Sequence, residues 1–191
     1  MRYTRTHKEE TRKKLLDASS AIAKKGGFSS TGVDALMSSI GLTGGAFYSH
    51  FHSKQELFGA IVEQEMQKSC DMMAGHRESP DNHVAKCVRD YLSTFHAVTP
   101  EVGCILPTLG AEIARAEPAV RQAVEQALKQ TQQSWSTRTG DADAAWALIA
   151  QLVGALVVAR TVESEKTRKE ILAASRRFLA KTIPLAASTK D

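Results

Sequence analysis

Apolar residues recur three and four positions apart along most of the chain, and nowhere do they alternate convincingly as in a half-buried strand. This spacing predicts amphipathic helices separated by turns that contain glycine, proline or helix-capping residues. About nine helices are expected, over residues 8–25, 31–40, 43–51, 53–66, 80–98, 104–115, 118–138, 142–159 and 164–183. The fold class predicted from the pattern is therefore all-α.

Capping residues and prolines mark several of the expected helix ends. Ser53 and Glu56 have the spacing of a full capping box, so a helix should begin directly after Ser53. Pro80 suits the first turn of the fifth expected helix, whereas Pro107 interrupts the sixth.

The length of 191 residues suits one mid-sized domain, or a small head joined to a larger body. The expected division is a head of residues 1–66 and a helical body of residues 67–191. A hydrophobic content of 42% is ordinary for a globular protein with a real core. Residues 2–14 are basic and polar with no apolar stretch behind them, so no signal peptide is expected. The three cysteines are widely spaced and form no CxxC, which predicts neither a disulfide framework nor a zinc site and favours a cytoplasmic location. They are Cys70, Cys87 and Cys104.

The net charge of +4 is concentrated at one end of the chain. Residues 1–60 hold nine Lys and Arg against five acidic residues, and the remainder holds 16 of each sign. A basic end on a neutral body is the asymmetry expected of a protein whose one end meets a polyanion. Proteins with neutral partners also have basic ends, so charge alone does not decide the partner.

Residues 31–51 have the layout of a helix-turn-helix. Thr31 and Thr43 are N-cap candidates for two short helices, and Gly41 with Leu42 forms the tight turn between them. Apolar residues of both helices fall on facing stripes and are expected to pack together. These are Val33, Leu36, Met37, Ile40, Leu42, Phe47 and Phe51.

The outer face of the second helix is small and polar, which allows a close approach to a groove wall. Tyr48 and His50 suit phosphate or base-edge contacts, and Lys54 suits a backbone phosphate. Thr31 and Thr43 stand at helix N-termini, where free N–H groups favour a phosphate. The predicted DNA-contacting residues are Thr31, Thr43, Gly44, Gly45, Ala46, Tyr48, Ser49, His50 and Lys54. His50 could instead cap or pack locally.

These residues carry a resemblance to the TetR family of transcriptional regulators. The similar motifs are Gly32-Val33-Asp34-Ala35-Leu36, Ile40-Gly41-Leu42-Thr43, Phe47-Tyr48-Ser49-His50-Phe51 and Ser53-Lys54-Gln55-Glu56-Leu57. The resemblance covers roughly residues 8–66. Two departures are visible: Phe47 stands where the family often has leucine, and Gly44-Gly45-Ala46 is less polar than many recognition helices.

The resemblance implies about nine helices, with a three-helix DNA-binding head and a helical body that dimerises through its last two helices. It also implies repression of transcription, with release from DNA when a small ligand binds in the body. The dimer-interface candidates are then the helices Ala142–Ala159 and Ser164–Ile183.

The segment Ala144–Ala159 is apolar almost all round, and it has alternative interpretations. It could be a buried core helix without a partner. A membrane span is not expected, since the segment is shorter than the roughly 18–20 apolar residues that a bilayer requires.

Five residues of the body are candidates for lining an effector pocket: Phe95, His96, Cys104, Trp135 and Trp146. Each could equally be a core residue, and Cys104 would act as a sensor only with a lowered thiol pKa. His50 and His52 do not predict a metal site, because residues two apart on a helix point in different directions. No metal and no cofactor are expected.

The function predicted is that of a DNA-binding regulator, in detail a dimeric repressor of a palindromic operator that an unknown small molecule releases. One alternative is a nucleoid or architectural protein without an effector, and another is a helical dimer that has lost operator binding. An enzyme is not expected, because the chain has no P-loop, GxGxxG, HExxH, GxSxG or paired-carboxylate motif.

Overall fold

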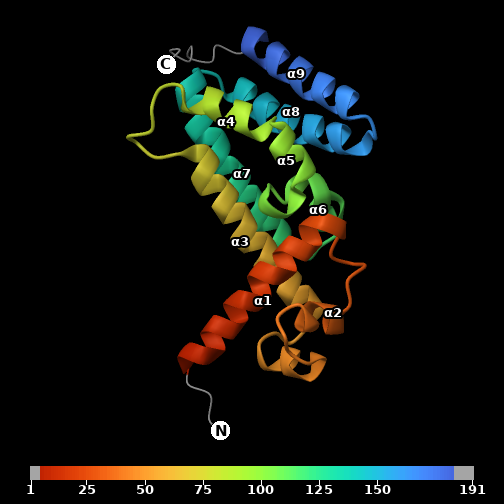
Figure 1. Ribbon diagram of the computed structural model, residues 1–191. Helices are drawn as coiled ribbons and strands as arrows, with labels where there is room; N and C mark the ends of the chain where they lie inside the picture. The colour runs from red at the N-terminus through yellow and green to blue at the C-terminus, as the bar shows by residue number, and fades with distance from the viewer. Residues whose placement is uncertain (1–4, 183–191) are drawn as a thin grey trace. The chain divides into compact units, whose positions relative to one another are not determined.

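The computed structural model describes residues 5–182 of the chain, which are entirely helical and connecting segments (Figure 1). The helices are α1 (Arg5–Gly26), α2 (Val33–Ser38), α3 (Lys54–Ala74), α4 (His83–Tyr91), α5 (Thr94–Val98), α6 (Leu106–Ala114), α7 (Pro118–Thr139), α8 (Ala142–Thr161) and α9 (Glu165–Thr182). Two 3₁₀ helices accompany them, η1 (Gly44–Ser49) and η2 (Pro100–Val102). The predicted all-α fold class is confirmed. Ile183, the predicted last residue of the final helix, lies outside the described residues.

The helices form two compact units. The first contains the chain up to Met66 together with Pro100–Val124, and the second contains Gln67–Thr99 together with the chain from Glu125. The segment Pro100–Val124 packs against α1 within the first unit, through η2 and α6.

The core of the first unit is built from α1, α2, η1 and the first half of α3. Leu36, Phe47 and Phe51 are buried, as the helix-turn-helix pattern predicts, and they share the core with Leu15 of α1 and Ile61 of α3. The other predicted inward residues Val33, Ile40 and Leu42 are only half-buried. Met37, which the pattern also predicts to point inward, is fully buried.

A buried ion pair ties the end of α1 to the rest of the first unit. The Lys24 ammonium lies 2.7 Å from a carboxylate oxygen of Glu65 on α3, and both side chains are less than 10% exposed. The same ammonium donates a hydrogen bond to the carbonyl of Gly103, at 3.2 Å. Next to it, the more exposed Lys25 pairs with Glu101 at 3.1 Å. The two lysines thus hold η2 and the residue directly after it against α1.

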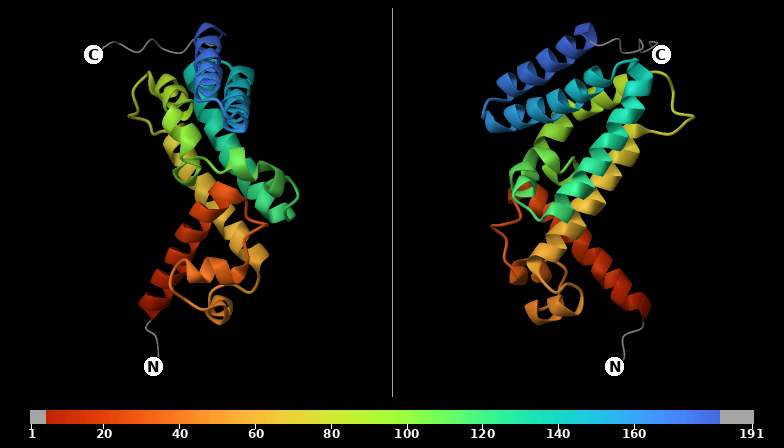
Figure 2. Two further views of the ribbon diagram at one scale, coloured as in Figure 1. Left: turned by 45° about the vertical axis from the view of Figure 1, so that its right-hand side comes forward. Right: turned by 180° about the vertical axis from the view of Figure 1, so that it is seen from behind.

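In the second unit, α8 and α9 run side by side in opposite directions in every view (Figures 1 and 2). One face of α8 is buried, with Leu148, Leu152 and Leu156 fully covered. Trp135 of α7 is the largest fully buried side chain, and its indole N–H donates to the carbonyl of Met73 at 2.7 Å. This satisfied indole is the polar centre of an otherwise apolar core.

The structure corrects the predicted helix 80–98. The chain forms α4 and α5 with a break between them, because Ser93 caps α5: its hydroxyl accepts the backbone N–H of His96 at 3.1 Å. Pro80 lies before the first residue of α4 and not in its first turn. Pro107 does not interrupt a helix; it stands in the first turn of α6, where a missing N–H costs no hydrogen bond.

The structure also corrects the length assigned to the apolar helix near residue 150. Helix α8 has 20 residues and a mean hydropathy of 1.8 over its most apolar window, so by length and composition it could cross a membrane. Its apolarity has another source in this fold. The fully buried Leu148, Leu152 and Leu156 line the packed face of α8, as expected of a core helix.

Candidate nucleic-acid interface

The helix-turn-helix is formed by α2, a turn at Gly41 and η1. Gly41 has φ +74, and the N–H groups of Gly41 and Leu42 bond to carbonyls of the last turn of α2. The C-cap of α2 is Ser39, so Gly41 is not its C′ residue as the sequence predicts but the left-handed residue one position further along the turn. The second element departs from the prediction, because it is a six-residue 3₁₀ helix that ends at Ser49. A start of two glycines has low α-helical propensity, which is consistent with this tighter, shorter form.

The two predicted N-caps have different outcomes. Thr43 does occupy the N-cap position of η1, but its side chain makes no capping hydrogen bond. Thr31 is not the N-cap of α2; Gly32 holds that position, and the Thr31 hydroxyl donates to the carbonyl of Gly27. Neither threonine side chain therefore caps a helix of the motif.

The capping box of α3 forms with one change. The Ser53 hydroxyl accepts the N–H of Glu56 at 3.0 Å, as predicted. The Glu56 carboxylate, however, accepts the backbone N–H of His52 at 2.7 Å, and the His52 ring lies 2.9 Å from the same oxygen. These contacts with His52 lower the pKa of the exposed Glu56 carboxyl. The turn between η1 and α3 is thereby fixed.

Aromatic side chains of η1 and of the residues directly after it pack together. The Phe47 and Phe51 rings lie 6.0 Å apart, and the Tyr48 ring meets Phe47 edge-on at 5.3 Å. The Arg12 guanidinium of α1 lies 4.6 Å from the centre of the Phe51 ring. Phe47 and Phe51 are thus the packing residues that hold the motif together, and Arg12 brings a positive charge beside it.

The residues predicted to contact DNA from the outer face of η1 differ in how exposed they are. Tyr48 is 67% exposed and is the largest side chain on this face. Thr43, Gly45 and Ser49 are exposed, whereas Gly44, Ala46 and His50 are half-buried. The Ser49 hydroxyl donates back to the carbonyl of Ala46 at 2.7 Å. Tyr48 is therefore the most prominent polar group that this face presents.

Gly44 of η1 lies directly against Asp34 of α2. A Cβ added at Gly44 would stand 1.8 Å from a carboxylate oxygen of Asp34, whereas one added at Gly45 would meet nothing within 4 Å. Asp34 stands in the first turn of α2, where the N-cap residue Gly32 makes no side-chain hydrogen bond. The Asp34 carboxylate fills the space that the missing side chain of Gly44 leaves.

Because of this contact, the effect of Gly44→Ala on the free energy of unfolding should change sign when Asp34 is replaced. Gly44→Ala should lower the free energy of unfolding by about 1 kcal/mol, because Asp34 must leave its rotamer. In an Asp34→Ala background the same change should raise it by roughly 0.5 kcal/mol, since alanine loses less backbone entropy than glycine. Urea unfolding of the four proteins measures both effects, with Gly45→Ala as the control. The same sign in both backgrounds would contradict the contact.

Lys54 uses its ammonium group within the first unit. It donates to the carbonyl of Ser29 at 2.9 Å and lies 4.9 Å from the centre of the Phe28 ring. The predicted phosphate contact by Lys54 would therefore use its remaining N–H groups. The lysine connects the beginning of α3 to the loop that leads into α2.

The same loop is also held by Glu112 of α6. The Glu112 carboxylate accepts the backbone N–H groups of Phe28 and Ser29, each at 2.9 Å, and the Ser29 hydroxyl at 2.5 Å. Gly27 has φ +88, and a Cβ there would lie 3.1 Å from Glu112. Partial burial raises the pKa of the Glu112 carboxyl, but the hydrogen bonds from Ser29 and Phe28 outweigh burial, so the pKa is lowered.

Sequence reasoning did not single out Glu112. Its partners are 83 and 84 residues away along the chain, and no local pattern indicates such a contact. The glycine pair before Phe28 was the one available signal, because a left-handed residue followed by free N–H groups forms a concave anion-binding turn.

The predicted effector-pocket residues have varied positions. Phe95 and Trp146 are 66% and 40% exposed, and Trp135 is a core residue with a satisfied indole. His96 is part-buried, with its ring 2.8 Å from the carbonyl of Tyr91, and Cys104 is buried in the first unit. The pocket that these residues would line remains a prediction.

The thiol with a shifted pKa is that of Cys87, outside the predicted set. Burial, followed by the nearby charge of Asp90, raises the pKa of Cys87 to about 11. Such a thiol is a poor nucleophile at neutral pH. Among the described residues, no group of three His, Cys, Asp or Glu is arranged to hold a metal ion.

Comparison with known proteins agrees with this geometry. Residues 15–61 match the family described as bacterial regulatory proteins, tetR family. No curated protein sequence matches the chain. Among solved structures, the reduced form of E. coli NemR shares 19% identity, with 94% of this chain and 100% of that chain covered and a TM-score of 0.76.

Two further structures are TetR-family regulators by their own descriptions. The one from Chloroflexus aurantiacus shares 22% identity over 94% of this chain and 98% of that chain, with a TM-score of 0.75. The one from Pectobacterium atrosepticum shares 25% identity over 95% and 98%, with a TM-score of 0.62. The fold and the helix-turn-helix together define a DNA-binding transcriptional regulator. Its DNA-binding segment is that of the tetR family, so the resemblance seen in the sequence is confirmed.

Proposed function

We infer that the protein is a cytoplasmic repressor that binds a palindromic operator as a homodimer and leaves it when a small molecule binds in the body. The observation that carries the DNA-binding part is the exposed outer face of η1, small at Gly45 and polar at Tyr48. A helix with such a face can sit deep in a major groove, while side chains at its edges contact phosphates.

The charge of the first unit supports contact with the DNA backbone. Exposed basic side chains line α1 at Lys8, Arg12, Lys13 and Lys14. Lys13 pairs with Asp17 on the same helix at 2.7 Å, but this pair is exposed and contributes little. The charge of these side chains, together with that of Lys54, favours a polyanion near the motif.

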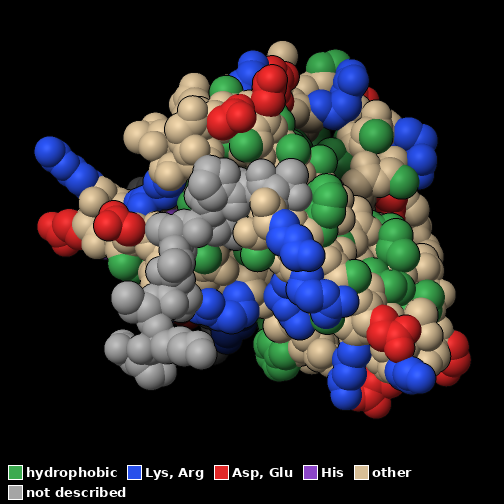
Figure 3. Space-filling model, turned by 90° about the horizontal axis from the view of Figure 1, so that it is seen from above, with side chains coloured by type: hydrophobic (Ala, Val, Ile, Leu, Met, Phe, Trp, Pro, Cys, Tyr) green, Lys and Arg blue, Asp and Glu red, His purple; other side chains and the backbone are tan. Residues whose placement is uncertain are grey.

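The homodimer part rests on the uncovered face of α8 and α9. Trp146, Val157 and Val158 of α8 and Phe178 of α9 are exposed, although all four are large and apolar. Seen from the α9 side, hydrophobic side chains lie among Lys and Arg side chains on this surface (Figure 3). Apolar patches of this kind mark interaction sites, and the family pattern assigns this one to a second copy of the chain.

Tyr48 provides the first test of this function. Tyr48→Ala should weaken operator binding by about tenfold or more, because one base-edge or phosphate contact is typically worth 1–3 kcal/mol. Tyr48→Phe removes only the hydroxyl, so it distinguishes the contribution of the hydroxyl to binding from that of the ring. Gln130→Ala, at an exposed position of α7, is the control. The measurement is an electrophoretic shift with the DNA upstream of the gene at several salt concentrations.

The same titration discriminates the alternatives. A repressor of an operator should bind the upstream DNA far more tightly than random DNA of equal length. Equal competition by random DNA would contradict the operator and favour a nucleoid or architectural protein. An effector is then sought as a small molecule that raises the melting temperature and releases the DNA.

A further inference from the structure

A cleft of about 380 Å³ opens within the first unit, beside the loop that leads into the helix-turn-helix. Three segments line it: the loop at Phe28 and Ser29, the first turns of α3, and the chain from Glu112 to Val120. The volume lies within the range of known small-molecule sites, which combine apolar walls with a few polar groups. None of the five predicted effector residues lines this cleft.

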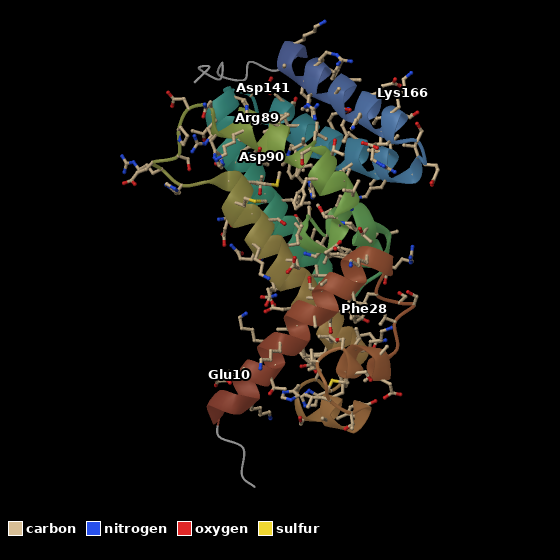
Figure 4. The ribbon with its side chains drawn as sticks, viewed as in Figure 1. Glu10, Phe28, Arg89, Asp90, Asp141 and Lys166 are labelled. Atoms are coloured by element: carbon tan, nitrogen blue, oxygen red, sulfur yellow. The ribbon has the colours of Figure 1, made fainter. Side chains whose placement is uncertain are left out.

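The apolar part of the cleft is aromatic. The Phe28 and Phe58 rings lie 5.0 Å apart with 30° between their planes, and Val120 of α7 lines the cleft beside them. Phe28 lies just beyond the end of α1 (Figure 4). Val120 packs closely on α3, since a Cβ added at Gly59 would lie 3.3 Å from its side chain. Such walls suit a flat apolar ring, which stacks in an offset or tilted arrangement on aromatic side chains.

The polar groups of the cleft have unused donors. Lys54 donates one hydrogen bond, to Ser29, and keeps two N–H groups. The exposed Arg115 guanidinium has no hydrogen bond or ion pair within the described part of the chain. In contrast, the Glu112 carboxylate already accepts three hydrogen bonds from the loop. Glu117 also lines the cleft, so the negative charges of Glu112 and Glu117 both oppose an anion and set the strength of the preference.

The helix ends add to the preference for an anion. Lys54 and Gln55 are the first residues of α3, and Glu117 directly precedes α7. Both helices have their positive dipole ends at the cleft. A planar carboxylate fits the forked donors of an arginine at this position better than a neutral or cationic group does.

We propose that this cleft binds a small aromatic carboxylate, with its ring against Phe28 and Phe58 and its carboxylate on Arg115 and Lys54. The site flanks the DNA-binding motif in sequence on both sides, since Ser29 precedes Thr31 and Lys54 follows Phe51. An occupant therefore contacts both ends of the motif and changes operator affinity. This effect on DNA rests on the function proposed above, but binding in the cleft does not.

The binding test uses 2-naphthoate as the probe, with 2-naphthamide and 2-naphthylmethylammonium as neutral and cationic counterparts. On the full chain, titration calorimetry measures the affinity of each probe, and saturation-transfer NMR shows whether the probe contacts the protein. The naphthoate should bind at least about tenfold more tightly than either counterpart. Arg115→Gln should weaken naphthoate binding by roughly tenfold, and Arg121→Gln, an exposed arginine of α7 outside the cleft, should leave it unchanged.

Several outcomes overturn the site. They are no binding of the naphthoate, equal binding of the amide or the amine, and equal loss in the two arginine variants. Val120→Trp, which fills the cleft, should abolish binding, and retention of binding would place the ligand elsewhere.

Operator affinity is measured separately from binding of the probe in the cleft. If naphthoate binds in the cleft without changing operator affinity, the coupling is wrong and the site stands. If the chain has no specific operator at all, the proposed function fails while the binding results still decide the site.

Discussion

Lys24→Met is expected to lower the free energy of unfolding by about 3–5 kcal/mol, because it removes one charge of the buried ion pair between Lys24 and Glu65. The pair is 2.7 Å long and both side chains are less than 10% exposed, so water does not replace the lost ammonium. The carbonyl of Gly103 also loses a donor. A loss of this size is a large fraction of the stability of a typical domain.

Two companion variants separate charge burial from helix packing. Lys24→Met with Glu65→Leu should recover most of the stability, since replacing a whole buried pair by apolar residues is often neutral. Lys25→Met, which removes the exposed pair with Glu101, should cost less than about 1 kcal/mol. Chemical unfolding followed by circular dichroism measures all three. Equal losses from Lys24→Met and Lys25→Met would mean that burial of the first pair has no energetic weight.

The pair matters for function through the loop that follows it. Lys24 lies three residues before Gly27, where the chain turns toward Phe28, Ser29 and α2. Glu65, Glu101 and Glu112 hold this end of α1 and the loop through separate contacts. The helix-turn-helix is therefore placed by acidic residues distant in sequence as well as by its own aromatic core.

Local sequence patterns predicted what local physics determines. Leu36, Phe47 and Phe51 are buried because their spacing places them on facing stripes of two adjacent elements. Gly41 forms the turn after α2 because a positive φ suits glycine, and Ser53 starts α3 because its hydroxyl accepts a free N–H. Each of these signals involves residues only a few positions apart.

The contacts that position the site could not be read in the same way. Lys24 and Glu65 are 41 residues apart, and Phe28 and Glu112 are 84 apart. Charged residues at such distances look like ordinary solvated residues until the fold brings them together. The break between α4 and α5 was missed for a different reason, since Ser93 interrupts a continuous apolar stripe without a glycine or proline.

Gly154→Glu is expected to convert the proposed dimer into a folded monomer and to weaken operator binding by about 100-fold or more, because a single head loses the gain from joined half-sites. A Cβ at Gly154 meets nothing within 4 Å, so the isolated chain has room for a side chain. Replacing a glycine within a helix by a better helix former should itself add about 0.5–1 kcal/mol of stability. The substitution is therefore harmless to one chain and harmful only where a second chain covers α8.

The position of Gly154 makes this test specific. Helical spacing places it on one face of α8 with Trp146, Ala150 and Val157, the face that α9 leaves exposed at Trp146 and Val157. Gly154→Ala is the matched control, since it adds helix propensity without charge, and Gln130→Glu adds the same charge on α7. Light scattering gives the mass and an electrophoretic shift gives the affinity. A Gly154→Glu protein that stays dimeric with full operator affinity would exclude this face as the interface, because a buried, unpaired carboxylate could not be accommodated at the centre of an apolar contact.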